Sequence, residues 1–104
     1  IYFNAGNSDL DKSYENDLDK ILNALKAHPG LGIEISGYAS AEGDEDFNKK
    51  LSNQRAISVL DYLNHRGVVR RRIIARGYGA SENEGASKEE SRRVELRIVD
   101  LSEI

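Results

Sequence analysis

Three polar side chains recur on one face of a helix-forming stretch whose neighbouring positions are apolar. Asn48, Ser52 and Arg55 are four and three residues apart, so a helix turning about 100° per residue places them together. Leu51 and Val59 fall on the same side, which should therefore be buried. A buried guanidinium needs an anion, because an unpaired charge inside a protein is costly. This pattern indicates either an internal ion pair or a binding site for an anionic ligand.

Both interpretations of Arg55 are open at this point. An internal partner could come from four carboxylates elsewhere in the chain, Glu42, Asp44, Asp61 and Glu95. Alternatively, the arginine stem covers the edge of the core while its head stays in water. In the functional interpretation, Arg55 binds a ligand carboxylate bidentately near the start of the helix, where the helix dipole also favours negative charge.

The elements that position these side chains follow from apolar periodicity. Alternation predicts strands, and 3.6-residue spacing predicts helices; the strands are 1–3, 31–40, 73–79 and 93–99, and the helices lie around 14–25 and 44–65. Phe47 falls on the apolar side of the second helix. Residues 80–91 are polar and should form a loop. We therefore expect an α/β (α+β) two-layer sandwich of order β-α-β-α-β-β, with two helices on one face of a mixed four-stranded sheet.

Composition limits the classes of protein that remain. The 104 residues are 32% charged and 38% hydrophobic, which is typical of a globular domain, so we expect 1–104 to form one domain. The net charge of −3 provides no general attraction for nucleic acid or acidic lipid. The absence of Cys excludes disulfides and thiolate chemistry. Because the chain starts in strand-like sequence, we interpret it as the C-terminal part of a longer protein.

Three stretches of the chain closely resemble the OmpA-like C-terminal domain family. They are ISGYASAEGDEDFNKKLSNQRAISVLDYLNHRGV, IIARGYG and SRRVELRIV, and with their order they cover essentially the whole chain. The most specific part is Asn48, Leu51-Ser52 and Arg55-Ala56, and the second is Arg92-Arg93-Val94. The resemblance implies a domain that binds peptidoglycan without cleaving it.

The resemblance also implies which residues contact the ligand, the diaminopimelate of the peptidoglycan stem peptide. In such domains the arginine at the position of Arg55 holds a diaminopimelate carboxylate. The arginine at the position of Arg92 also reaches the ligand, and Asn48 lines the same pocket. Backbone groups of the turn at about 38–43 complete the site.

The chain departs from the family pattern at the end of its second strand. The usual ending is Gly-His/Tyr-Thr-Asp, whose Asp pairs with the ligand's ammonium group, and here the Thr and Asp positions are Ala39 and Ser40. Serine can accept a hydrogen bond but carries no charge. Glu42 is the nearest replacement, although it could equally cap the following helix.

The function implied by the resemblance is anchoring of an outer-membrane protein to the cell wall, in the periplasm, with no cofactor or metal. Association with the outer membrane would come from another part of the chain or from a partner, and the domain would be a monomer or weak dimer. The alternative is a degenerate OmpA-like domain that acts as a structural or protein-interaction module. That alternative predicts an internal partner for Arg55, with Glu42 the first candidate.

An enzyme and a nucleic-acid-binding protein are the rival classes. Catalysis would need a nucleophile with a base, two opposed carboxylates or a metal. The two histidines, His28 and His65, lie at helix ends where a cation is favoured anyway, so we expect no enzyme. The arginines at 66, 70, 71, 72 and 76 are clustered, but an acidic domain with few aromatic residues is a poor candidate for binding nucleic acid, and we expect none.

Overall fold

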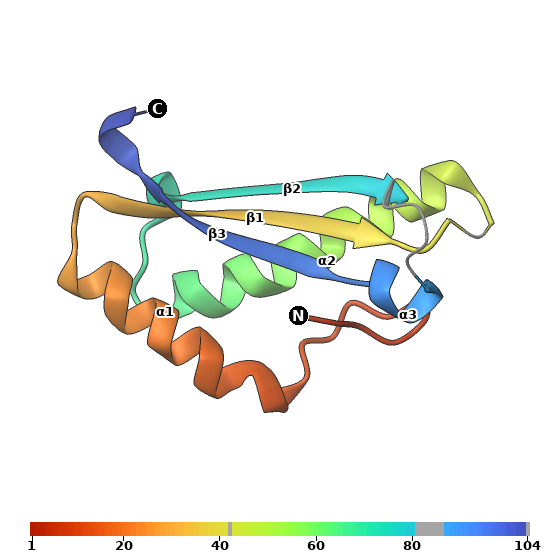
Figure 1. Ribbon diagram of the computed structural model, residues 1–104, viewed down its shortest axis with the longest axis horizontal. Coiled ribbons are helices and arrows are strands. Elements are labelled where there is room, and N and C mark those ends of the chain that lie inside the picture. Colours follow the sequence, from red (N-terminus) through yellow and green to blue (C-terminus); the bar gives the residue numbers. More distant parts are fainter. Residues whose placement is uncertain (42, 81–86, 104) are drawn as a thin grey trace.

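The computed structural model describes residues 1–41, 43–80 and 87–103, which form a layer of helices on one face of a sheet (Figure 1). The elements in chain order are η1 (Lys12–Tyr14), α1 (Glu15–Ala27), β1 (Leu31–Ala39), α2 (Glu45–His65), η2 (Arg70–Arg72), β2 (Ile73–Ala80), α3 (Lys88–Ser91), β3 (Val94–Asp100) and η3 (Leu101–Glu103). The short helix α3 occupies the end of the stretch expected to be a loop, and residues 81–86 of that stretch lie outside the described residues.

The sheet is mixed, with β1 at its centre and the strand order β2-β1-β3. β1 runs parallel to β2, with Ile33 opposite Ile73, and antiparallel to β3, with Ile33 opposite Ile98. The parallel pair follows from the helical crossover through α2, because parallel strands need a long connection. The expected α+β architecture with a mixed sheet is confirmed.

The expectation of four strands is not met in the described residues, where the sheet has three. The segment at 1–3 makes one isolated antiparallel bridge, Tyr2 opposite Arg93. Val94 N donates to Ile1 O at 2.7 Å, and Phe3 N donates to Arg92 O at 2.8 Å. Beyond Phe3 the chain faces α3 instead of β3. A helix offers no ladder of backbone partners, so the pairing stops there.

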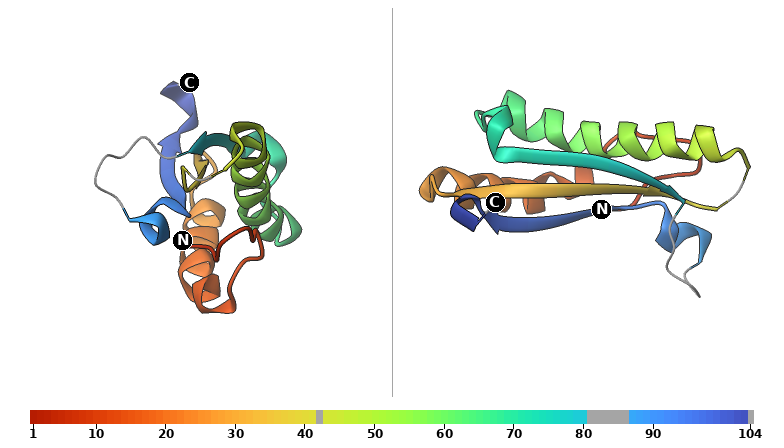
Figure 2. Two further views of the ribbon diagram at one scale, coloured as in Figure 1. Left: turned by 90° about the vertical axis from the view of Figure 1, so that its right-hand side faces the viewer. Right: turned by 90° about the horizontal axis from the view of Figure 1, so that it is seen from above.

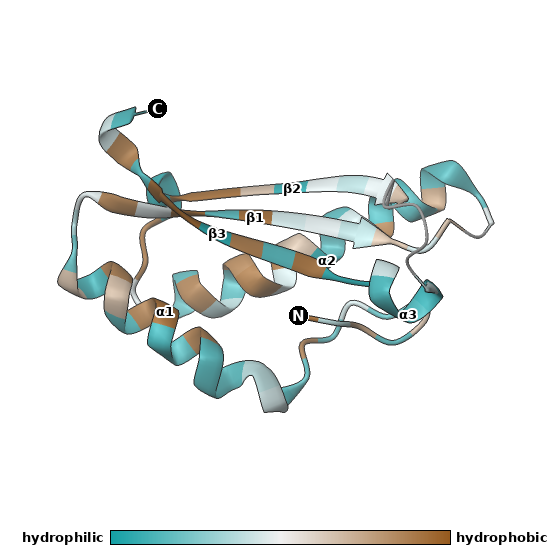
Figure 3. Ribbon diagram, viewed as in Figure 1, coloured by the Kyte–Doolittle hydropathy of each residue, from teal (hydrophilic) through white to brown (hydrophobic). Residues whose placement is uncertain are grey.

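The core lies between the helices and one face of the sheet. Figure 2 shows α1 and α2 on the same side of the sheet in its end-on view, and the apolar residues of both helices belong to one buried cluster with those of β1. Its members include Leu18, Leu22, Leu25, Ile33, Ile35, Val59 and Leu63. The hydropathy colouring of Figure 3 shows apolar positions on both helices and on the three strands. In the described residues, no helix has both the length and the apolar character needed to cross a membrane.

α2 approaches the sheet closely because glycines face it. A Cβ on Gly37 would overlap the Ser52 carbonyl oxygen, and a Cβ on Gly77 would overlap the backbone of Asn53. The helix therefore rests on the backbones of β1 and β2. Phe47, which spacing placed on the core side, is instead 53% exposed. It lies in the first turn of α2, which extends past the ends of the strands (Figure 1), so no sheet is available to cover it.

Candidate functional site

Arg55 is fully buried on the inner side of α2. Its guanidinium donates three hydrogen bonds to backbone carbonyl oxygens: Nε to Asn7 at 2.9 Å, Nη1 to Tyr38 at 3.0 Å and Nη2 to Asn4 at 3.0 Å. The guanidinium carbon also lies 5.4 Å from the centre of the Phe3 ring. Arg55 thus fastens the N-terminal segment to the end of β1.

Among the described residues, neither structural explanation for Arg55, an internal ion pair or a head group in water, is met. In the part of the chain that the structure describes, no carboxylate pairs with its guanidinium, and this removes Asp44, Asp61 and Glu95 as internal partners. Glu42, the remaining candidate, lies outside the described residues. The guanidinium does not reach water either, because the whole residue is buried. Burial, and then the positive charge of Arg92, lower the pKa of Arg55 to about 10, so the side chain stays protonated at neutral pH.

Arg92 is the second cation at this end of the molecule. It directly follows α3, and its side chain lines a cleft of about 550 Å³. Its Nε is buried and has no hydrogen-bond partner within residues 1–41, 43–80 and 87–103. A buried donor without a partner is unfavourable, so an anion that enters the cleft would gain a charge-assisted hydrogen bond. An anion would also relieve the repulsion between Arg92 and Arg55.

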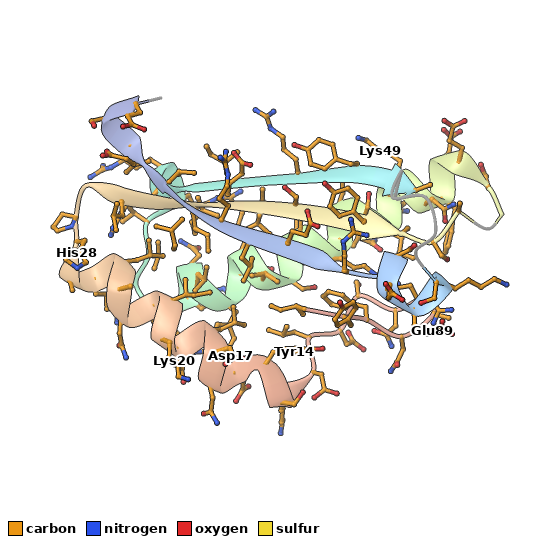
Figure 4. The ribbon with its side chains drawn as sticks, in the orientation of Figure 1. Tyr14, Asp17, Lys20, His28, Lys49 and Glu89 are labelled. Atoms are coloured by element: carbon orange, nitrogen blue, oxygen red, sulfur yellow. The ribbon has the colours of Figure 1, made fainter. Side chains whose placement is uncertain are left out.

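The cleft lies between the N-terminal segment and α3. Phe3, Asn4 and Asn7 form one wall, and Arg55 lies behind that wall because it binds the carbonyl oxygens of Asn4 and Asn7. Figure 4 labels two further lining residues, Tyr14 before α1 and Glu89 in α3. In this structure Arg92 therefore faces the cleft directly, while Arg55 acts on it through the N-terminal segment.

Carboxylates complete the lining of the cleft, and the sequence did not point to them. They are Asp9, Asp11, Glu89 and Glu90. Hydrogen bonds from the backbone and then the side chain of Ser13 hold the pKa of Asp11 below its usual value. The carboxylates come from two segments that meet only in the folded chain, so no spacing in the sequence could reveal them.

The remaining sequence-predicted residues lie around the end of β1 and the start of α2. Ala39 is buried at the end of β1, Ser40 is half-buried next to it, and Asn48 is buried in α2. Glu42 lies outside the described residues. Ser52, from the same polar helix face, has a structural role: its hydroxyl donates to Lys49 O and accepts from Gly79 N, each at 2.8 Å.

The geometry defines a class of site: a cleft on an α+β scaffold that is lined by Arg92, with Arg55 buried behind its wall. In the described residues there is no group of His, Asp or Glu side chains placed to hold a metal ion. The OmpA family model matches residues 2–97, so the chain belongs to the OmpA family, which is a non-enzymatic family. The expectation that the chain is not an enzyme is confirmed by this membership.

Several relatives of the chain are lipoproteins, outer-membrane proteins or peptidoglycan-binding proteins. It is 32% identical over 106 residues to a probable lipoprotein, YiaD, of Escherichia coli, covering 97% of this chain and 48% of that protein. It is 38% identical over 100 residues to the peptidoglycan-binding protein ArfA of Mycobacterium tuberculosis, covering 91% of this chain and 30% of that protein. The chain thus spans half or less of the length of these relatives.

A solved structure agrees with the fold. The peptidoglycan-associated lipoprotein of Burkholderia pseudomallei superposes with a TM-score of 0.87 at 26% identity, covering 95% of this chain and 88% of that one. The chain is therefore an OmpA-like domain related to lipoproteins and peptidoglycan-binding proteins of the cell envelope.

Proposed function

We propose that this domain binds peptidoglycan non-covalently through the diaminopimelate of the stem peptide. The observation that carries the proposal is the pair of arginines, Arg55 and Arg92, at one end of the fold. Neither has a carboxylate partner among the described residues, and Arg92 lines an open cleft. The relationship to ArfA and to the peptidoglycan-associated lipoprotein supports the same ligand.

The arginines differ in role in this proposal. Arg92 binds the side-group carboxylate of diaminopimelate with its unpartnered Nε–H. A guanidinium has five N–H donors, and carbonyl oxygens accept three bonds from Arg55, so Arg55 can offer further donors to a carboxylate that displaces part of the N-terminal segment. Asn48 and the strand end at Ala39 and Ser40 complete the pocket.

The ammonium group of diaminopimelate needs negative charge that Ser40 cannot provide. Glu42, outside the described residues, is one candidate. The carboxylates that line the cleft, Asp9, Asp11, Glu89 and Glu90, are another, since they line the same cleft as Arg92. This distribution lets the domain hold a zwitterionic group although it has serine at the usual Asp position.

The role of the whole protein follows from the domain. We propose that residues 1–104 are one domain of a longer envelope protein, and that it anchors this protein to the wall in the periplasm. Its association with the outer membrane would come from another part of the protein or from a partner. We propose a monomer or weak dimer.

Calorimetric titration tests the proposal, with meso-diaminopimelate and stem peptides as ligands. A stem peptide with lysine in place of diaminopimelate is the matched ligand, because lysine lacks the side-group carboxylate. We expect saturable binding of the diaminopimelate peptide and at least roughly tenfold weaker binding of the lysine peptide, since a charge-assisted hydrogen bond contributes about 1.5–3 kcal/mol. Arg92→Ala should remove this discrimination.

Arg71→Ala is the control variant, because Arg71 is an exposed arginine in η2, at the end where β1 and β2 begin, away from the cleft. It should bind as the wild type does. A folded wild-type domain that binds neither peptide would contradict the proposal. The degenerate-module alternative would then apply, and the carbonyl bonds of Arg55 would be a purely structural device.

A further inference from the structure

The face of the sheet opposite the helices is uncovered. Register places Glu34, Ser36 and Tyr38 of β1 on this face, because their neighbours Ile33 and Ile35 point into the core. We call it the open face; its members are Glu34, Ser36, Tyr38, Ile74, Arg76, Tyr78, Arg93, Glu95 and Arg97, with Lys49 reaching its edge. The cleft proposed to bind the stem peptide is a different site, since it is lined by Arg92, whereas Arg93 belongs to the open face.

A continuous row of aromatic and basic side chains crosses the open face. The rings of Tyr38 and Tyr78 stack with centroids 5.6 Å apart, and the Arg93 guanidinium lies 4.3 Å from the centre of the Tyr38 ring. Lys49 lies 5.8 Å from the centre of the Tyr78 ring and donates to Gly77 O, so it reaches β2 from α2 (Figure 4). Because Tyr38 is on the central strand, Tyr78 and Arg93 lie on its opposite sides.

Next to this row the face is hollowed at Ser36. A depression of about 750 Å³ is lined by both tyrosines and by Glu34, Ser36 and Arg97, among others. Arg97 pairs with Glu34 at 3.1 Å, and Arg93 pairs with Glu95 at 3.1 Å. In the described part of the chain, the tyrosine hydroxyls have no hydrogen-bond partner. The depression is therefore lined by ion-paired side chains and has tyrosine hydroxyl donors at its rim.

The charge of the open face is opposite in sign to that of the chain. Four basic side chains, Lys49, Arg76, Arg93 and Arg97, face two carboxylates, Glu34 and Glu95, which gives a balance of +2 on this face against −3 for the chain. Tyrosine and arginine are the residues enriched at the centres of protein interfaces. Side chains already held in place also lose little conformational entropy on binding.

We propose that the open face docks an acidic segment of a protein partner. The ring of Tyr38 lies between Tyr78 and Arg93, so it offers no open ring face on which a sugar could stack. Among the members of this face Tyr78 is the exposed large apolar side chain, and its aliphatic member Ile74 is half-buried, so the face presents no exposed aliphatic group that would enter a membrane. Two copies of the chain placed open face to open face would oppose a balance of +2 with another +2. The proposal does not depend on peptidoglycan binding.

The test is an NMR titration of the isotope-labelled chain with a synthetic peptide of alternating glutamate and serine. A peptide with glutamine in place of every glutamate is the matched control. We expect saturable shifts of the open-face amides with the glutamate peptide alone. Arg76→Glu should weaken binding roughly tenfold, because an attractive contact becomes repulsive. Arg71→Glu, which makes the same charge change in η2, should have less than about a twofold effect.

Four results would overturn the proposal. One is that Arg76→Glu and Arg71→Glu weaken binding of the glutamate peptide equally. Another is that the glutamine peptide shifts the open-face amides as much as the glutamate peptide does. The others are binding of vesicles containing phosphatidylglycerol that Arg76→Glu abolishes, and a concentration-dependent dimer that Arg76→Glu dissociates. Tyr78→Ala tests the same surface without a change in charge, and it should weaken peptide binding while the rest of the amide spectrum stays unchanged.

Discussion

Arg55→Ala should destabilise the fold strongly, before any effect on a ligand is considered. The substitution removes the hydrogen bonds that hold the carbonyl oxygens of Asn4, Asn7 and Tyr38. It frees the N-terminal segment from the end of β1. Because Phe3 belongs to the buried core, release of this segment also exposes apolar surface.

The magnitude follows from two opposing contributions. Three hydrogen bonds from a charged donor contribute roughly 6 kcal/mol, at about 2 kcal/mol each. Against this, burial lowers the pKa of Arg55 to about 10, so the protonated side chain is less favourable in the fold than in the unfolded chain by about 3 kcal/mol. The alanine variant loses the three hydrogen bonds but no longer carries the cost of burying the charge. The expected net loss in the free energy of unfolding is therefore about 3 kcal/mol.

Urea and thermal unfolding would measure this loss. For a domain of this size, about 3 kcal/mol corresponds to a fall in Tm of roughly 12–24 °C. Arg55→Lys should lie between alanine and the wild type, because an ammonium group cannot span three separated carbonyl oxygens. Arg71→Ala, an exposed control, should stay within about 0.5 kcal/mol of the wild type. A loss below about 1 kcal/mol for Arg55→Ala would refute this account of the buried guanidinium.

Three further predictions concern packing, a buried hydroxyl and acid stability. Gly37→Ala should cost about 2 kcal/mol or more, because its Cβ would meet the backbone of α2, whereas Gly30→Ala, with open space around it, should be close to neutral in thermal unfolding. Ser52→Ala leaves a buried amide of β2 without its acceptor and should cost about 1–3 kcal/mol in urea unfolding. The pKa of Asp11 is lowered in the fold, so its ionised form stabilises the fold fully above pH 3.8, and this stabilisation is lost as the pH falls through the lowered pKa. In acid, the Tm of the wild type should therefore fall more than the Tm of Asp11→Asn.

Periodicity in the sequence was sufficient for the central elements. Ile33 and Ile35 alternate because one face of β1 is buried, and the helical spacing of Leu51, Val59 and Leu63 marks the inner face of α2. Phe47 fits the same spacing but is exposed, since periodicity gives the direction of a side chain and not how far the opposing sheet extends. The pairing of residues 1–3 likewise depends on where α3 lies, which their own sequence does not encode.

The candidate site was predictable on one side only. A polar run on an apolar helix face marked Arg55, and the structure places it in the interior without a carboxylate partner among the described residues. Its carbonyl partners, Asn4, Asn7 and Tyr38, could not be inferred because backbone acceptors leave no trace in residue types. The acidic side of the cleft joins Asp9 to Glu89 across 80 positions of sequence, so it depends on how α3 packs against the N-terminal segment.

The two Gly-Tyr pairs connect the buried and exposed faces of the sheet. Gly37 lies opposite Gly77 in the parallel register, so both glycines face α2 while Tyr38 and Tyr78 stack on the other side. A slip of one residue would place a tyrosine beneath the helix, which the close contact forbids. Lys49 belongs to α2 and also reaches Tyr78, so the distance of the helix from the sheet sets the Lys49 end of the aromatic row. Gly77→Ala should therefore push α2 away from the sheet and separate Lys49 from Tyr78. It should weaken the binding of an acidic segment to the open face without altering any side chain of that face.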